Sequence, residues 1–218
     1  MPMDYTTLTG AKTVEGSIRN YINWAETPAD TVLTEAQAYI FSRLRVREME
    51  HVVRNLTIAE DAETLELPPD FIAPMGQDCF GIQSPWQCSI DIFDAAQFET
   101  YRATDETGAV YAGQPRACMI LGQPAVAHFD VKADQAYSAK LLYYRRPAAL
   151  ADDNPTNWLT DRYPQLLRHA TNYFAWLHKR EPAQASASEK LVGHFIDVAN
   201  GEADMERQSR RVENYWRS

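Results

Sequence analysis

Hydrophobic side chains near the start of the chain recur at every third or fourth position, a spacing that places them on one face of a helix. The pattern predicts one helix over residues 14–26 and another over residues 34–50. Thr34 stands directly before a run of good helix formers and is the predicted N-cap of the second helix. Together these helices predict an αα-hairpin over residues 1–50.

Between residues 51 and 147 the pattern changes to alternation, and β-branched residues become common. Gly122-Gln123-Pro124 separates two apolar runs and predicts the turn of a hairpin. The composition of residues 91–101 also allows a short helix. Strands are predicted over residues 51–58, around Leu65, and over residues 118–121, 126–131 and 137–146. The middle of the chain is therefore predicted to be rich in β-structure.

Helical spacing returns from residue 154 onwards and predicts a helical bundle over residues 154–202. Pro164 suits the first turn of a helix, where its missing N–H costs nothing. Pro182 is predicted to break or restart the chain before a long C-terminal helix over residues 188–218. The predicted core face of that helix consists of Leu191, Val192, Phe195, Ile196 and Ala199.

Residues 203–218 are polar on nearly every side of this predicted helix, so they have little of their own to bury. Two interpretations are open: a frayed tail, or a helix that docks on a partner. The second is favoured because Val212, Tyr215 and Trp216 are costly to leave in water and can serve as anchors. The whole pattern predicts a mainly α chain with a small β portion (α+β). It would form one domain over residues 1–218, a helical bundle with an inserted antiparallel β-hairpin or sheet and a long C-terminal helix.

Composition and cysteine content narrow the classes of protein. Hydrophobic residues make up 45% and charged residues 23% of the 218 positions, as in globular domains. No apolar run approaches the roughly 18 residues of a membrane helix, and no secretory signal is expected at the N-terminus. Cys79, Cys88 and Cys118 lack the spacing of a zinc site or a disulfide framework, which favours free thiols in a reduced intracellular setting.

The charge of the chain is acidic and uneven. Lys and Arg number 21 and Asp and Glu number 30, giving a formal net charge of −9, which argues against a general nucleic-acid binder. Residues 1–109 hold most of the acidic excess, whereas residues 110–218 are nearly neutral. This asymmetry predicts two surfaces with different partners, with ordinary solubility charge as the alternative.

The sequence contains no catalytic constellation. No two of the five histidines lie four residues apart, and the motifs of nucleotide-binding loops and serine hydrolases are missing, so no metal and no cofactor is predicted. A small hydrolase using Asp152, Asp153 and His128 remains an alternative, although Asp152-Asp153-Asn154-Pro155 is more typical of a turn. A DNA-binding module is the other alternative. It would use Arg43, Arg45 and Arg47, with Arg43 and Arg47 on one helix face and Glu48 and Glu50 near enough to neutralise them.

A series of short motifs, spread over about 150 residues, resembles a known family. In chain order they are Leu67-Pro68-Pro69-Asp70-Phe71, Gln123-Pro124, Leu142-Tyr143-Tyr144-Arg145-Arg146-Pro147, Leu150, Asn157-Trp158-Leu159, Tyr163-Pro164-Gln165-Leu166-Leu167 and Ala170. This order is similar to that of the head-to-tail adaptor (connector) proteins of tailed bacteriophages, especially short-tailed ones.

The resemblance implies a structural protein of the virion, located at the head–tail junction and made in the host cytoplasm. Adaptors of this kind form rings, commonly of twelve copies, under the portal protein, where they extend the DNA channel and offer a surface to the tail or nozzle. It implies no enzymatic activity, no cofactor and no membrane contact, and DNA that passes without sequence-specific binding. Contact with the portal or a neighbouring subunit is expected from Arg207, Arg210, Arg211, Tyr215 and Trp216, and contact with a tail component from Gly122, Gln123 and Pro124.

Overall fold

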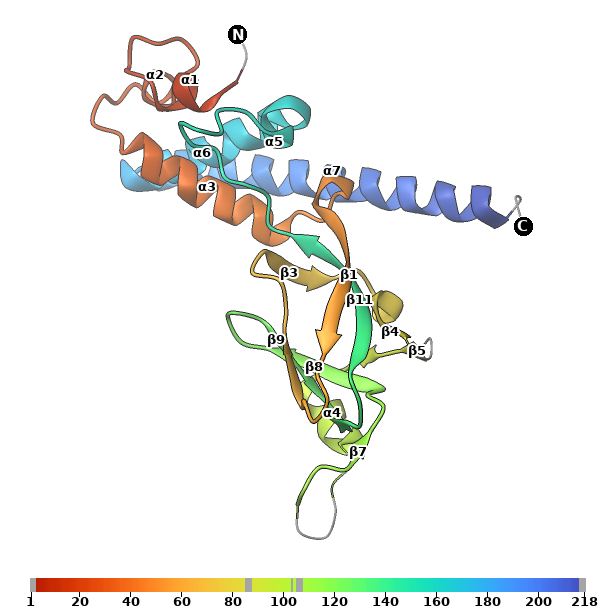
Figure 1. The fold of residues 1–218 in the computed structure, drawn as a ribbon. Helices are drawn as coiled ribbons and strands as arrows, with labels where there is room; N and C mark the ends of the chain where they lie inside the picture. Colours follow the sequence, from red (N-terminus) through yellow and green to blue (C-terminus); the bar gives the residue numbers. More distant parts are fainter. Residues whose placement is uncertain (1–2, 85–87, 103, 105–107, 216–218) are drawn as a thin grey trace. The chain divides into compact units, whose positions relative to one another are not determined.

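The chain divides into two compact units, each described here by itself. The helical unit comprises Met1–Glu48 and Pro147–Ser218, and the β unit comprises Met49–Arg146. The computed structural model (Figure 1) describes residues 3–84, 88–102, 104 and 108–215, apart from the side chains of Gln77 and residues 208–215. Helices account for 42% and strands for 26% of the structure, which confirms the α+β class. That the two units act as one adaptor domain stays a prediction.

The first predicted helix, over residues 14–26, is wrong. The N-terminal part of the helical unit has instead two short helices, α1 (Tyr5–Thr9) and α2 (Ile18–Tyr21). Gly16 adopts φ +89°, a left-handed conformation that interrupts a helix. Ser17 then caps α2 by accepting a hydrogen bond from the backbone N–H of Asn20, and Asn23 again takes a positive φ. The hydrophobic spacing is helical, but the local turn chemistry dominates.

The second predicted helix exists with different ends. Helix α3 (Ala29–Arg43) begins five residues before Thr34, whose hydroxyl donates to the carbonyl of Asp30 from inside the helix instead of capping it. The helix also ends seven residues early, and Asn200 takes part in this end. The Asn200 side chain accepts from the backbone N–H of Arg45 at 2.7 Å and donates to the carbonyl of Arg43 at 3.2 Å. A 3₁₀ turn, η1 (Arg47–Met49), then leads to the first strand.

The rest of the helical unit follows the predicted pattern more closely. Helix α5 (Trp158–Arg162) is capped by Asn157, and α6 (Pro164–His178) begins at the proline as expected. Helix α7 (Pro182–Tyr215) is continuous, so Pro182 starts the last helix six residues earlier than predicted. It packs against α6 with a face of small and branched side chains, namely Ala185, Val192, Ile196, Ala199 and Ala203. No helix in the described part of the chain is long and apolar enough to cross a membrane.

The β unit confirms the five predicted strands within a few residues. They are β1 (Glu50–Ile58), β2 (Thr64–Glu66), β8 (Ala117–Leu121), β9 (Val126–Phe129) and β11 (Tyr137–Arg145). The short helix is α4 (Ala95–Tyr101), which Asp94 caps. The sequence pattern missed β3 (Phe71–Pro74), the 3₁₀ turn η2 (Gln77–Cys79), β4 (Phe80–Ser84), β5 (Cys88–Ser89), β6 (Asp91–Ile92), β7 (Ala112–Gly113) and β10 (Lys132–Ala133).

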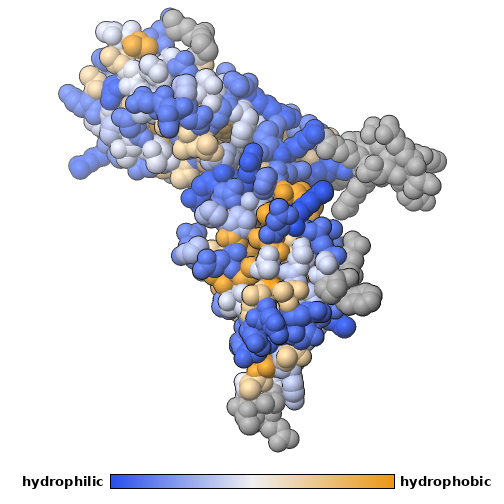
Figure 2. Space-filling model, in the orientation of Figure 1, coloured by the Kyte–Doolittle hydropathy of each residue, from blue (hydrophilic) through white to orange (hydrophobic). Residues whose placement is uncertain are grey.

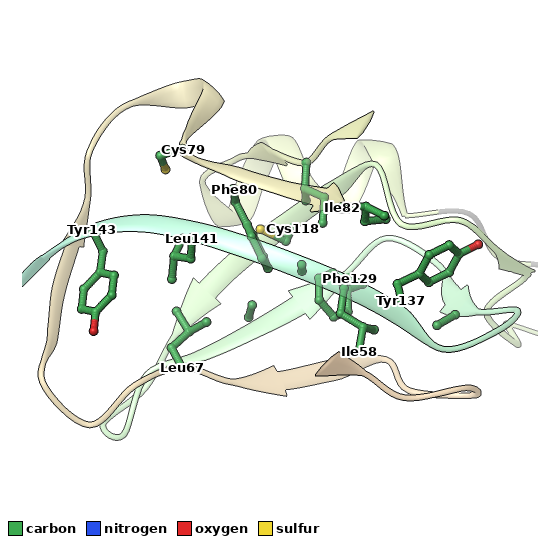
Figure 3. Close-up of a cluster of buried hydrophobic side chains, with 14 residues drawn as sticks. Ile58, Leu67, Cys79, Phe80, Ile82, Cys118, Phe129, Tyr137, Leu141 and Tyr143 are labelled. Carbon is green, nitrogen blue, oxygen red and sulfur yellow. The ribbon is translucent and has the colours of Figure 1, made fainter. Parts of the chain in front are cut away.

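Two sheets enclose the core of the β unit (Figure 3). One has the order β1-β11-β4-β5, with β3 also paired to β11, and the other has the order β2-β9-β8-β6. Alternate residues of β11 are buried, as predicted for Ala139, Leu141 and Tyr143. Phe80 and Phe129 meet in this core with ring centroids 6.2 Å apart.

Burial shifts the pKa values of several side chains in the β unit. Tyr143 donates to the Asp70 carboxylate at 2.8 Å, and burial together with this hydrogen bond raises the pKa of its phenol. Burial raises the pKa of the Cys118 thiol to about 12, and it also raises the pKa of Cys79. These two thiols are therefore expected to be protonated at neutral pH and to react slowly with a disulfide reagent, because the thiolate is the reactive form.

This arrangement predicts unequal reactivity of the three cysteines. Cys79 and Cys118 are 4% and 0% exposed, whereas Cys88 is only partly buried. At pH 8 we expect Ellman's reagent to titrate one thiol per folded chain within minutes and all three after denaturation. Cys88→Ser should remove the fast reaction. Three fast thiols in the folded chain would contradict the closed β core.

Candidate interaction surfaces

The residues of the two alternative functions lie in ordinary structural settings. Asp152 and Asp153 are exposed in a turn closed by reciprocal backbone hydrogen bonds between Ala151 and Asn154, which confirms the turn interpretation. His128 lies on β9 in the β unit. Among the residues that the structure describes, no group of three or more His, Cys, Asp or Glu side chains is placed to hold a metal ion.

The predicted basic face of Arg43 and Arg47 is wrong, because α3 ends at Arg43 and Arg47 belongs to η1. The guanidinium of Arg43 lies 4.1 Å from the centroid of the Tyr39 ring and donates to its hydroxyl. Arg45 donates to backbone carbonyls near the end of α3, including that of Leu44 at 2.7 Å. These two arginines therefore stabilise the end of their own helix.

Glu48 has an ion-pair partner outside the stretch of arginines at residues 43–47. Its carboxylate pairs with Arg162, and this hydrogen bond raises the pKa of the Arg162 guanidinium. Arg162 also reaches Glu206 on α7 at 3.1 Å. The resulting bridge joins α5 to α7 and to the segment that follows α3.

Arg207 is the first of the predicted portal-binding residues. It lies on α7 at a point where this helix still contacts the segment after α3. Arg207 donates to the carbonyl of Arg45 at 2.7 Å and pairs with Asp204 at 2.5 Å. Its guanidinium thus contacts its own chain. Arg210, Arg211 and Tyr215 continue the helix backbone, but their side chains lie outside the described residues, as does the whole of Trp216.

The predicted tail-binding turn borders a groove in the β unit. Gly122 adopts φ +83°, and a Cβ added there would lie 3.2 Å from the carbonyl oxygen of Pro124, so the turn requires glycine. The groove has a volume of about 510 Å³. It is lined by Pro68, Pro69, Phe71, Ile72, Ile120, Leu121, Gly122, Gln123, Pro124, Ala125 and Arg146.

This groove gathers residues that are far apart in the sequence. Leu121 is 46% exposed at its edge, and Arg146 is the single charged residue in the lining. Figure 2 shows hydrophobic residues exposed on the surface of the β unit. The sequence pattern predicted the turn but missed the wall formed by residues 68–72. Pro68 and Pro69 were the sequence signal for this wall, since two consecutive prolines interrupt a regular strand.

Comparison with known proteins gives one informative result. A family model described as SU10 adaptor protein matches residues 3–214, which span both compact units. A comparison with curated proteins gives no match. The family match confirms the resemblance to phage head-to-tail adaptors that the sequence motifs indicated. The chain therefore belongs to the SU10 adaptor protein family.

Proposed function

We propose that this protein joins head and tail in a phage virion as a ring bound under the portal, with twelve copies as the expected number. The ring would extend the DNA channel and offer the attachment surface for the tail. The observation that carries this proposal is the family match, because it covers the helical unit and the β unit together. The protein would be made in the host cytoplasm and then act at the head–tail junction as a structural part, without catalysis.

The charge of the chain supports a role as a conduit. Duplex DNA carries one negative charge per about 1.7 Å, so a basic channel would hold it strongly. The chain is acidic at −9, and twelve copies would carry roughly −108. The β unit alone has 14 acidic and seven basic residues. A ring of this charge would let DNA pass without gripping it.

Two surfaces are proposed for the two neighbours. The end of α7, with Arg210, Arg211 and Tyr215, and the following Trp216 would dock in a groove of the portal or of an adjacent subunit, as in other helix-in-groove contacts. Arg207 would serve this contact by fixing the helix through Arg45. The turn at residues 122–124 and the groove beside it would contact a tail component.

The test is assembly with the portal protein of the same phage. We expect native mass spectrometry and negative-stain images of the mixture to show a ring of fixed stoichiometry attached to the portal. A gel-shift at moderate salt should retain no duplex DNA. A chain that stays monomeric and never co-sediments with the portal would contradict the proposal.

A further inference from the structure

The helical unit contains a pocket of about 220 Å³ between helix α6 and the N-terminal segment with α1 and α2. Helix α6 contributes Arg168, Thr171 and Asn172 to its lining. The other lining residues come from α1, from α2 and from the turn at Gly16 and Ser17 that precedes α2. The turn that interrupts the first predicted helix therefore also builds one side of this pocket.

Asn172 carries a buried amide that borders the pocket without a partner. The residue is 2% exposed, and its side chain makes no hydrogen bond within the described part of the chain. Two other side chains have fully enclosed polar atoms without a partner, but Asn172 is not one of them, so its amide is open to the pocket. In native structures such a group points to a ligand or an ordered water that completes its hydrogen bonds.

The other two buried polar residues of the pocket have partners in the chain. The hydroxyl of Thr171 donates to the carbonyl of Arg168 at 2.9 Å, and the hydroxyl of Ser17 donates to the carbonyl of Ala11 at 3.0 Å. The amide of Asn172 is the exception among them. Folding thus removes it from bulk water without giving it a protein partner, which is costly for a group with only a structural role.

Arg168 adds a positive charge next to this amide. It lies one helical turn before Asn172, so the two side chains share a face of α6. Arg168 is partly buried, and among the residues that the structure describes its guanidinium forms no ion pair. Glu15 also lines the pocket but is exposed and does not pair with it. Two groups with unused hydrogen-bonding capacity therefore meet at one pocket.

The chemistry of these groups favours a carboxylate as the ligand. A guanidinium presents a planar fork of N–H donors that matches a carboxylate in a bidentate pair. The Asn172 amide can donate to a carbonyl beside that carboxylate and accept from a neighbouring N–H. The charge of Glu15 disfavours phosphate, because a dianion is repelled more strongly than a carboxylate.

The size of the pocket favours a single side chain. Its volume of about 220 Å³ lies below the roughly 300–1,000 Å³ that is typical of sites for small molecules and cofactors. An Asp or Glu side chain on another protein supplies a carboxylate together with the peptide groups that an amide recognises.

We propose that the pocket at Arg168 and Asn172 binds the carboxylate of an Asp or Glu side chain on a neighbouring protein of the head–tail assembly. This inference rests on the proposed function, which supplies the neighbour. Arg168 would hold the carboxylate, and Asn172 would bind the backbone next to it. The pocket shares no residue with the end of α7 or with the groove beside residues 122–124, so it would be a third contact.

A pair of blocked amino acids tests the chemistry of the pocket directly. N-acetyl-glutamate methylamide has one side-chain carboxylate between two peptide groups, and the glutamine compound differs only in its neutral amide. We expect the glutamate compound to bind the unassembled full-length chain about tenfold more tightly, as measured by NMR of the Nε–H signal of Arg168. Equal binding of the two compounds, or no shift at Arg168, would mean that the pocket holds only water and would overturn the proposal.

Two arginine variants provide a matched comparison. Arg168→Gln should weaken binding of the glutamate compound about tenfold and remove the preference over the glutamine compound. Arg180→Gln removes an exposed arginine just after the same helix and should leave both affinities unchanged. An equal loss in the two variants would indicate a general effect of charge and would overturn the site.

Asn172→Leu separates a ligand-binding amide from a structural one. Leucine has the same branching and needs no hydrogen bond, so the Tm of the unassembled chain should stay the same or rise by up to about 4 °C. Binding of the glutamate compound should weaken severalfold. A lower Tm with unchanged binding would show that the amide supports the fold, and would overturn its proposed role.

The double variant Arg168→Gln with Asn172→Leu tests the role of the pocket in assembly. We expect ring formation or portal attachment to require an about tenfold higher concentration, as measured by native mass spectrometry and sedimentation, while circular dichroism confirms folding. Normal rings with normal portal attachment would overturn the contact, while the adaptor function would stand. A wild-type chain that forms no ring with or without the portal would overturn both the proposed function and the neighbour named here.

Discussion

Removal of residues 208–218 is expected to abolish attachment to the portal while the subunit stays folded. The segment contains Tyr215 and Trp216, aromatic side chains of the kind that dominate binding interfaces. Loss of two such anchors should weaken portal binding by about a hundredfold or more. The contacts of Asn200 and Arg207 with the segment after α3 remain in the shortened chain.

A portal pull-down and a thermal melt together check this prediction. Deletion of residues 203–218 is the matched comparison, because it also removes the buried Ala203, the Glu206 partner of Arg162 and the Arg207 contact. The longer deletion should lower the Tm, whereas the shorter one should leave it nearly unchanged. Full portal binding by the shorter chain would show that another surface carries the attachment.

Phe129→Ala is expected to lower the free energy of unfolding by about 3–5 kcal/mol. The ring is 2% exposed between the two sheets of the β unit, next to Phe80, as Figure 3 shows. Truncation leaves a cavity that the paired strands around it cannot close. A loss of this size is a large fraction of the stability of an ordinary domain.

Chemical denaturation of the wild type and the variant measures this loss. Tyr111→Ala provides the control, since this side chain is 54% exposed and its backbone contact with Lys132 does not depend on it. The control should change stability by no more than about 0.5 kcal/mol. A similar small effect for Phe129→Ala would mean that the two sheets do not pack as described.

The sequence pattern predicts an element well when its hydrophobic period is clear and its ends are set by neighbouring residues in the sequence. Strand β11 has strict alternation and clear flanking turns, so its bounds and its buried side both follow from the sequence. The end of α3 does not, because the group that binds its last carbonyl comes from Asn200, and Arg207 binds the carbonyl of Arg45 just beyond it. The helix over residues 14–26 failed for a different reason, since Gly16 takes a conformation that periodicity does not register.

The candidate surfaces show the same division. A turn at residues 122–124 follows from its Gly and Pro, but the groove beside it needs residues 68–72 and Arg146 brought together by folding. The exposed side chains of α7, among them Leu191, Val198 and Met205, were not distinguished because they lie close in sequence to those of the buried face. Leu191 and Val192 were both predicted in the core face, yet Leu191 is 43% exposed and Val192 is 0% exposed. Only packing against α6 separates the two sets of side chains.

The way in which the chain enters and leaves the β unit has an evolutionary consequence. Residues 49–146 form one continuous insertion, and its first and last strands are partners, with Glu50 opposite Tyr144. Paired residues of antiparallel strands lie about 4.5–5.5 Å apart between Cα atoms. The insertion therefore has the topology of a cassette with closely spaced ends. Recombination between phages could exchange it whole without moving the two chain segments of the helical unit apart.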